Sequence, residues 1–319
     1  MRSKLMIILL SSVILSGCFP NYKNLTVNKI DYGSDFVNYY TLRGDEPDIK
    51  NKNLIIWLDG SSWESAIGVK GRIVPWRKIS LAYALQKYLS KDFDILVPDK
   101  LNYEFGKEYT YDYMNDYYDN PKIVGEYTMH NRVLAAKLVI DSFLVNENYK
   151  NVILMGYSEG GLILPRVYSE LAQKDKITGL INACYGGMSY SDALKETAKE
   201  DTAMQSYIVK AFDEIRKYPE AIDKHAFGWP LRKWTDFMWY EPMKDYESIN
   251  IPILLIHGNE DKNMTVESSR YMVKQFGGLG KNNLKYIEVH DDHYLSKSTD
   301  LIKVMQEWIT SLPSTSKKQ

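Results

Sequence analysis

A Gly-x-Ser-x-Gly motif at residues 156–160 constrains the fold of this chain more than any other segment. The apolar run 151–155 precedes the motif and the small and apolar residues 161–164 follow it, a pattern that predicts a strand, a tight turn and a helix. Such a turn strains the serine backbone, and the flanking glycines leave room where a Cβ would clash. We therefore expect the Ser158 hydroxyl to stand above the edge of a sheet, near the amides that begin the helix.

Two later segments offer the partners that a nucleophilic serine needs. A serine hydroxyl reacts well only when a base takes its proton and an acid orients that base. Residues 251–258 predict a buried strand followed at once by an acidic loop, and residues 284–289 predict another strand followed by His290-Asp291-Asp292-His293. Catalytic groups gather in loops at the carboxyl ends of strands in open α/β sheets, so serine, acid and base should meet on one side of the sheet.

With these segments in place, the chain resembles the α/β-hydrolase superfamily over roughly residues 50–312. The stretches GYSEGG, PILLIHGNED and DDHYL are each similar to segments of that superfamily, and they occur in the same order. The resemblance implies an α/β fold with a mainly parallel central sheet, flanking helices and a helical cap insertion. It also implies that Ser158 is the nucleophile, Asp261 the acid and His293 the base.

Neighbouring residues compete for two of these roles. His290 lies three residues before His293, which we favour because it is further into the loop and nearer the following helix. Glu260 competes with Asp261, which we favour because the acid of this fold follows its strand by several residues. Asp291 and Asp292 rank behind both.

An oxyanion hole requires two backbone N–H groups fixed in place before reaction. One is expected to be the amide of Glu159, the residue after the nucleophile. The other is expected from residues 59–63, which follow the buried strand predicted at 53–58. The superfamily commonly has His-Gly here, whereas this chain has Asp59-Gly60. Because the glycine is kept, we assign the amide of Ser61, with Ser62 as the second choice.

Two further residues are interpreted as structural. Cys184 ends the strand-like run 177–183, and no histidine or acidic motif surrounds it in the sequence, which favours a buried thiol in the core. His257 ends a predicted strand beside Gly258 and is expected to brace the turn there.

The start of the chain predicts export and lipid attachment. Residues 1–4 are short and basic, and residues 5–15 are apolar but too short to span a bilayer. Residues 15–18, LSGC, resemble the lipobox of bacterial lipoproteins, which implies cleavage before Cys18 and its lipidation; a plain secretory signal is the alternative. Several acyl chains would anchor the protein stably to a membrane of the bacterial cell envelope. The resemblance implies that Phe19, in place of an aspartate after the cysteine, argues against retention at an inner membrane and favours the outer membrane in a Gram-negative cell.

The remaining chain divides into segments of different character. We expect a signal peptide at 1–17, a polar tether at 18–34, a hydrolase core at 35–188 and 249–312, a helical cap at 189–248, and a polar tail at 313–319. Residues 125–143 carry a broad apolar stripe and predict one long helix. The tyrosine-rich residues 101–118 predict either an aromatic wall beside the site or a surface loop. Aromatic residues of the cap either line the pocket or attach the cap to the core.

Charge and motifs exclude several classes of partner. The formal net charge is −1, whereas nucleic-acid binding requires a basic face. The sequence has no H-E-x-x-H motif and no paired cysteines, and residues 277–282 lack the spacing and the final Ser or Thr of a phosphate loop. We therefore expect neither a metal nor an organic cofactor, and no nucleic-acid partner.

The sequence thus predicts a serine hydrolase that cleaves a carboxylic ester of a small acyl substrate through a Ser-His-Asp triad and an acyl-enzyme. One alternative is a serine peptidase or amidase of the same fold. Another is a noncatalytic binding lipoprotein that has kept the fold.

Overall fold

The computed structural model describes residues 25–68, 82, 85, 88–89, 91–109, 111–112, 117–295, 297–298 and 300–313. The predicted signal peptide, Cys18 and residues 314–319 lie outside this part of the chain. Among the described residues, no helix has both the length and the hydropathy that crossing a bilayer requires.

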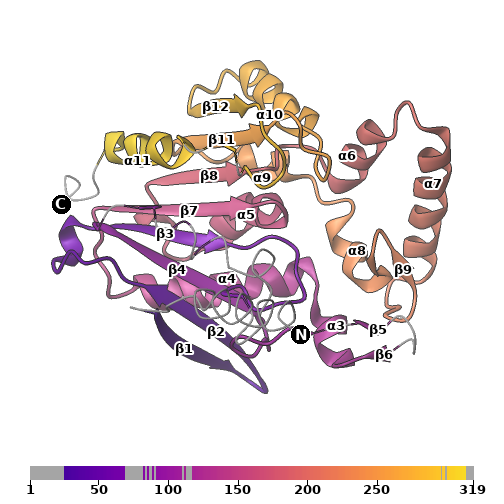
Figure 1. The fold of residues 1–319 in the computed structure, drawn as a ribbon, viewed down its shortest axis with the longest axis horizontal. Coiled ribbons are helices and arrows are strands. Elements are labelled where there is room, and N and C mark those ends of the chain that lie inside the picture. Colours follow the sequence, from indigo (N-terminus) through magenta and orange to yellow (C-terminus); the bar gives the residue numbers. More distant parts are fainter. Residues whose placement is uncertain are drawn as a thin grey trace, which may run out of the picture.

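An eight-stranded sheet forms the centre of the molecule, in the order β1-β2-β4-β3-β7-β8-β11-β12 (Figure 1). The strands β1 and β2 form an antiparallel hairpin, β2 pairs antiparallel with β4, and every later pair is parallel. The predicted α/β fold with a mainly parallel sheet is therefore confirmed. The strands are β1 (Leu25–Tyr32), β2 (Asp35–Leu42), β3 (Asn53–Leu58), β4 (Phe93–Leu101), β7 (Asn151–Tyr157), β8 (Gly179–Ala183), β11 (Ile253–Gly258) and β12 (Leu284–Val289).

The first strand corrects the predicted tether at residues 18–34. Strand β1 occupies Leu25–Tyr32 and pairs residue by residue with β2, from Leu25 opposite Leu42 to Tyr32 opposite Asp35. It lies at the edge of the sheet, and none of its side chains is fully buried. An edge strand can therefore keep a polar sequence like that of a linker, which is why composition alone pointed to a tether.

Helices cover both faces of the sheet. Alternate residues of β3 point to opposite sides: Leu54, Ile56 and Leu58 pack with residues of α4 and α5, whereas Ile55 and Trp57 pack with residues of α11. Strands covered on both faces are nearly continuous apolar runs, as β3 and β7 are after the buried asparagine that begins each of them. The core helices are α3 (Pro121–Glu126), α4 (Met129–Leu144), α5 (Glu159–Glu170), α10 (Glu267–Gly278) and α11 (Leu301–Ser311).

The single helix predicted at 125–143 is two helices. Helix α3 ends at Glu126 and α4 begins at Met129, because the Thr128 side chain accepts a hydrogen bond from the Asn131 amide and caps α4. An N-cap residue has extended backbone angles, which interrupts the preceding helix.

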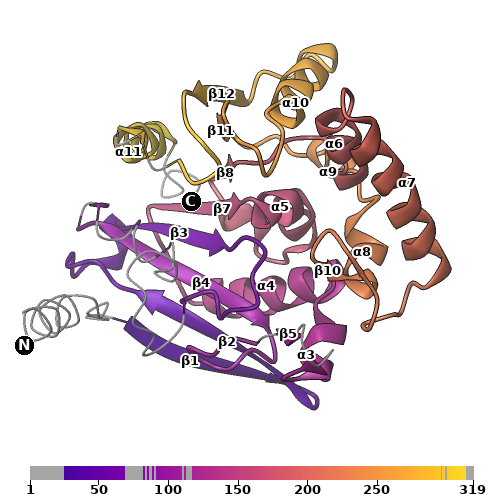
Figure 2. The ribbon, with the colours of Figure 1, turned by 45° about the vertical axis from the view of Figure 1, so that its right-hand side comes forward.

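Most of the predicted cap stands beyond the carboxyl ends of the parallel strands (Figures 1 and 2). Its last helix, α9, instead packs against the core helix α5, and Tyr246 accepts a hydrogen bond from Asn182 of β8. The final part of the segment 189–248 therefore belongs to the layer of core helices. The elements of this segment are α6 (Tyr190–Thr197), α7 (Thr202–Lys217), β9 (His225–Ala226), β10 (Trp229–Pro230), α8 (Leu231–Phe237) and α9 (Pro242–Tyr246).

Short elements complete the described chain. They are the 3-10 helices η1 (Ile49–Asn51) and η2 (Lys174–Lys176) and the strands β5 (Tyr111–Asp112) and β6 (Tyr117–Tyr118), which pair with each other.

Candidate active site

Ser158 occupies a strained turn between β7 and α5. Its backbone angles are φ 54° and ψ −119°, a conformation that residues other than glycine rarely adopt. The two glycines of the motif are required by close backbone contacts. A Cβ on Gly156 would lie 2.3 Å from the Gly160 carbonyl oxygen, and a Cβ on Gly160 would lie 2.1 Å from the Leu58 carbonyl oxygen. The turn can therefore place Ser158 at the sheet edge only with glycine at both positions.

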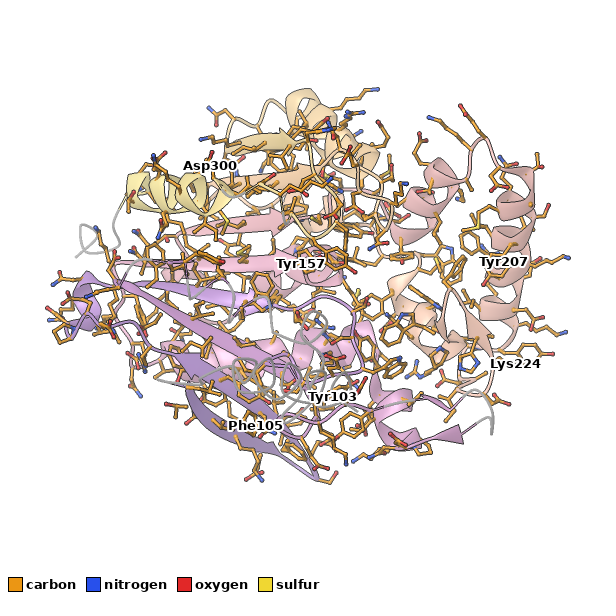
Figure 3. All side chains as sticks on the ribbon, in the orientation of Figure 1. Tyr103, Phe105, Tyr157, Tyr207, Lys224 and Asp300 are labelled. Atoms are coloured by element: carbon orange, nitrogen blue, oxygen red, sulfur yellow. The ribbon has the colours of Figure 1, made fainter. Side chains whose placement is uncertain are left out.

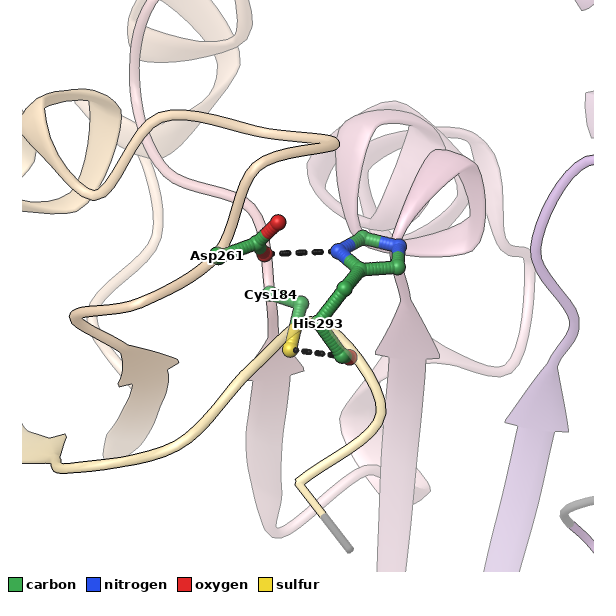
Figure 4. A group of neighbouring side chains, drawn as sticks. All are labelled: Cys184, Asp261 and His293. Carbon is green, nitrogen blue, oxygen red and sulfur yellow. Dashed lines mark hydrogen bonds and ion pairs between the residues drawn. The ribbon is translucent and has the colours of Figure 1, made fainter.

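The structure brings Ser158, His293 and Asp261 into one hydrogen-bonded chain. His293 Nε2 lies 3.0 Å from Ser158 Oγ, and His293 Nδ1 lies 2.6 Å from Asp261 Oδ2. A carboxylate only accepts, so we assign the proton to Nδ1, which leaves Nε2 to accept from the serine hydroxyl. Asp261 Oδ1 in turn accepts from the amides of Asn263 and Met264. Figure 4 shows the contact between His293 and Asp261.

The Asp261 carboxylate is stabilised in its charged form. Burial alone would raise its pKa, but hydrogen bonds from His257 and His293 outweigh burial and hold the pKa well below its usual range. His257 Nε2 lies 3.2 Å from Asp261 Oδ2 and 3.0 Å from the Met264 carbonyl oxygen, while Nδ1 lies 2.7 Å from Ser269 Oγ. His257 thus braces the turn, as predicted, and also orients the Asp261 carboxylate. The sequence position of His257, four residues before Asp261, could have indicated this contact with the acid.

The competing residues point elsewhere. The His290 side chain is 82% exposed and lies against Asn259 and Glu260. Glu260 pairs with Lys297 at 2.8 Å. Asp291 accepts hydrogen bonds from the amides of Asp292, Lys297 and Ser298.

Cys184 is buried, but its surroundings differ from those predicted. Its Sγ donates to the His293 carbonyl oxygen at 3.1 Å, and the ligand atoms of Cys184, Asp261 and His293 lie within 4.8 Å of one another (Figure 4). The sequence could not reveal this neighbourhood because β8 and the two loops are distant along the chain. Burial raises the pKa of the thiol well above its usual value, so it remains a donor. The Tyr157 hydroxyl donates to the same carbonyl at 2.9 Å, and together the two donors fix the His293 backbone.

The two expected oxyanion residues, Glu159 and Ser61, line the same cavity as Ser158. Helix α5 begins at Glu159, so the Glu159 amide has no acceptor within its own helix. Arg132 holds the other loop: its guanidinium donates to the Asp59 carbonyl at 2.6 Å and to the Gly60 carbonyl at 3.3 Å. Because the peptide bond is trans, the Ser61 N–H points away from Arg132. Ser62 does not line the cavity; its hydroxyl donates to the Glu64 carbonyl.

A buried cluster of charges lies beside the nucleophile. Glu159 Oε1 accepts from Arg132 at 2.9 Å and from the Tyr127 hydroxyl at 2.6 Å, and Glu159 Oε2 pairs with Lys233 of α8 at 2.7 Å. Burial raises the pKa of Glu159, but Lys233 and Arg132 outweigh burial and lower it below its ordinary value. Burial lowers the pKa of Lys233 to about 8 despite its contact with Glu159. No local motif marked Arg132 or Lys233, because each acts through residues far away in the sequence.

The cap and the core enclose a cavity of about 150 Å³ over Ser158. Its lining residues are Ser61, Ser158, Glu159, Tyr185, Tyr190, Trp229, Lys233, Trp234, Asn263, Met264 and His293. Aromatic residues of the cap therefore line the site. The tyrosine-rich segment 101–118 does not supply the predicted wall from its described side chains: Tyr103 and Tyr109 are buried against each other, with ring centroids 4.9 Å apart. Figure 3 shows Tyr103 on the core side of the molecule, away from Tyr207 on the cap at the right of the view.

Solved structures with similar folds include esterases and a peptidase. Est1E from Butyrivibrio proteoclasticus is 17% identical with a TM-score of 0.55, and the match covers 89% of this chain and 99% of that chain. The Pyrococcus furiosus esterase Pf2001 is 14% identical with a TM-score of 0.54, covering 90% and 91%. Pyrococcus horikoshii acylaminoacyl peptidase is 15% identical with a TM-score of 0.55; the match covers 90% of this chain but only 41% of the peptidase. At these identities the likeness concerns the fold.

Sequence comparison adds the family. No curated protein sequence matches this chain. The family model described as serine hydrolase (FSH1) matches residues 131–304, more than half of the chain, and this range includes Ser158, Asp261 and His293. The protein therefore belongs to the serine hydrolase (FSH1) family and has the α/β-hydrolase fold.

Proposed function

We propose that this protein hydrolyses a carboxylic ester through an acyl-enzyme formed on Ser158. One observation carries the proposal: the His293 imidazole lies between Ser158 Oγ and Asp261 Oδ2, at 3.0 and 2.6 Å. This arrangement lets one side chain accept the serine proton while a charged carboxylate stabilises the imidazolium that forms.

The reaction follows from the positions of these groups. His293 Nε2 takes the hydroxyl proton as Ser158 Oγ attacks the ester carbonyl carbon, and the amides of Glu159 and Ser61 stabilise the negative oxygen. His293 then protonates the departing alcohol, which leaves the acyl group on Ser158. Water, deprotonated by His293, attacks the acyl-enzyme and releases the carboxylic acid and the free serine.

An ester is favoured over a peptide bond as substrate. The two esterases cited above resemble this chain over nearly their whole length, whereas the acylaminoacyl peptidase matches over 41% of its length. This is support at the level of fold. The amidase alternative makes a different prediction in the kinetic test below.

Replacing Ser158 should abolish most of the rate of ester hydrolysis. Ser158→Ala removes the nucleophile, so we expect kcat/KM for a short-chain acyl ester to fall by at least about 10³-fold, because the serine and its base act as a unit. His293→Ala should cause a loss of similar size. The measurement is release of alcohol by the purified wild type and the two variants.

The control is a variant of the rival histidine. His290→Ala changes a side chain that is mostly exposed and should retain activity close to that of the wild type. Full activity in Ser158→Ala would overturn the proposal. Faster wild-type turnover of aminoacyl amides than of the matched esters would favour the peptidase or amidase instead.

We also propose that lipid on Cys18 attaches the protein to a membrane of the bacterial cell envelope. The support is the LSGC sequence at residues 15–18, preceded by a short basic start and an apolar run.

A further inference from the structure

The cavity beside Ser158 has room for a small group only. At about 150 Å³, it resembles in size an engineered protein cavity that holds one benzene molecule. Aromatic rings of Tyr190, Trp229 and Trp234 contribute to its wall, so a long acyl chain would have to leave the cavity. The group that enters it should therefore be short.

One wall of this cavity carries a buried ion pair between Lys233 and Glu159. The Lys233 side chain is 1% exposed, and its Nζ lies 2.7 Å from Glu159 Oε2 and 3.4 Å from the centre of the Trp229 ring. Glu159 is shared, because its other oxygen already accepts from Arg132 at 2.9 Å. Two buried cations thus converge on one carboxylate. Asp99 and Lys100 are also buried nearby, and the half-buried Asp59 acts on the charge of Arg132, but none of these three residues lines the cavity.

A buried cation without full compensation is costly unless something else pairs with it. An ammonium group has three donors, and among the described residues Glu159 is the carboxylate that Lys233 contacts. The ammonium also lies over four aromatic rings, with 4.8 Å to the ring centre of Tyr127, 4.9 Å to that of Trp234 and 5.5 Å to that of Phe237 in addition to Trp229. Because Lys233 lines the cavity, a donor that Glu159 does not use can serve a ligand there.

Tyr185 provides a second, independent observation. It lines the same cavity, its side chain is fully buried, and its hydroxyl has no hydrogen-bond partner among the described residues. Burial raises the pKa of this phenol well above its usual value, with Tyr190 and Glu159 adding to the effect, so the hydroxyl keeps its proton. A buried hydroxyl without a partner is costly, and an acceptor oxygen in the cavity would satisfy it.

On the basis of the hydrolase function proposed above, we propose that the substrate is a monoester of a short dicarboxylic acid, whose free carboxylate binds Lys233 and Tyr185. The acyl half occupies the enclosed cavity, with the ester carbonyl at Ser158 and the carboxylate at the far end. Hydrolysis consumes one water and yields the dicarboxylic acid and an alcohol, so no further reactant is needed.

The position of the acyl half follows from the second opening of the site. A larger cleft of about 480 Å³ shares Asn263 and His293 with the cavity, and its other lining residues are Glu260, Lys262, Asp292 and Tyr294. The departing alcohol must lie beside His293 Nε2 to receive its proton. The alcohol therefore occupies this cleft, and the acyl half occupies the enclosed cavity.

The experiment compares two esters of the same alcohol and of matched acyl size. Monoethyl succinate carries the carboxylate, and ethyl 4-methylpentanoate replaces it with a branched methyl end; ethanol release is measured for both. We expect the wild type to have the higher kcat/KM for monoethyl succinate. A wild type that hydrolyses the neutral ester at least as well would overturn the proposal.

Two variants test the residues. Lys233→Met keeps an unbranched chain without the charge, and we expect the ratio of kcat/KM for the anionic ester to that for the neutral ester to fall about 10- to 100-fold. Tyr185→Phe removes one hydroxyl and should lower the ratio about 3- to 10-fold. The matched control is Lys244→Met, because Lys244 is exposed on α9; its ratio should stay at the wild-type value.

A structural role alone gives a different result. If Lys233 serves only to hold the cap, Lys233→Met slows both esters by the same factor, and that outcome overturns the proposal. Should this variant fail to fold, the wild-type preference and the ratio in Tyr185→Phe decide instead.

A third ester tests the side on which the carboxylate binds. O-acetylglycolate carries its carboxylate on the alcohol half, and its hydrolysis relative to ethyl acetate should not depend on Lys233. A dependence seen only with this ester would move the subsite to the leaving group and contradict the assignment.

Different results would contradict the hydrolase mechanism and the carboxylate subsite. If neither Ser158 nor His293 is needed for any ester, the hydrolase mechanism falls. If both are needed but the anionic ester is not preferred, only the carboxylate subsite falls.

Discussion

At the scale of single residues, Glu159 joins three parts of the site. Its backbone begins α5 beside Ser158, and its carboxylate binds Arg132 of α4, the Tyr127 hydroxyl and Lys233 of the cap. Arg132 in turn holds the carbonyls of the oxyanion loop. A single buried carboxylate therefore links the nucleophile turn, the opposite loop and the cap.

The Glu159→Gln variant tests this link through stability. The amide keeps the shape but leaves two buried cations without their anion, so we expect the free energy of unfolding to fall by about 3 kcal/mol. Urea denaturation measures the change. The matched control is Glu241→Gln, which breaks an exposed pair with Lys244 and should cost under about 1 kcal/mol. Equal effects of the two variants would contradict the role assigned to Glu159.

The sequence identified residues whose signal is local and missed those whose signal is spatial. Ser158 was predicted because its turn requires glycines within two residues, and Asp261 and His293 because each lies in a loop that follows a predicted strand. Lys233 and Tyr185 gave no such signal. Their significance depends on a cavity whose lining residues come from distant parts of the chain, with Tyr185 just after β8 and Lys233 on α8.

At the scale of elements, helix α8 is attached to the core through the start of α4. Asp236 Oδ1 accepts from the Met129 amide at 3.1 Å, and Oδ2 accepts from the His130 amide at 3.0 Å. These amides have no acceptor within their own helix. A cap side chain therefore completes a core helix, which fixes the position of Lys233 three residues earlier on α8.

We expect Asp236→Ala to loosen the cap. Loss of these two hydrogen bonds should cost about 1–2 kcal/mol and should speed amide hydrogen exchange in α8 and in the first turn of α4. Ester hydrolysis should slow as well. Asp201→Ala removes the N-cap of α7, an interaction within the cap, and should leave exchange at the start of α4 unchanged. Identical exchange patterns in the two variants would count against the attachment.

Elements were predicted well where hydrophobic pattern decides them and less well where single hydrogen bonds do. The buried strands at 151–157 and 253–258 followed from continuous apolar runs. The break between α3 and α4 depends on one Thr128 side chain, which a broad apolar stripe does not reveal.

At the scale of the whole molecule, the site lies between the edge of the sheet and a cap. The first strand begins soon after Cys18 in the sequence. Strand β1 starts at Leu25, so covalent geometry limits the span of residues 18–24 to about 25 Å. Composition had suggested a longer tether because an edge strand needs few buried side chains, so its sequence can be as polar as that of a linker. With lipid on Cys18, the domain would be held close to the membrane surface.

The anchor makes a prediction in cells. Cys18→Ala should move the protein from the membrane fraction to the soluble fraction and abolish incorporation of labelled palmitate, because the acceptor thiol is lost. Cys184→Ser is the matched control, since that thiol is buried in the core, and it should retain both signals. Palmitate labelling that survives in Cys18→Ala would exclude this residue as the attachment site.

The central claim is that Ser158 is activated by His293 and Asp261. The most direct measurement is reaction of the folded protein with a fluorophosphonate, followed by mass spectrometry of the digested adduct. We predict one phosphonyl group on the peptide that contains Ser158, abolished in Ser158→Ala and strongly slowed in His293→Ala. An adduct on another residue, or equal labelling of Ser158→Ala, would contradict the account.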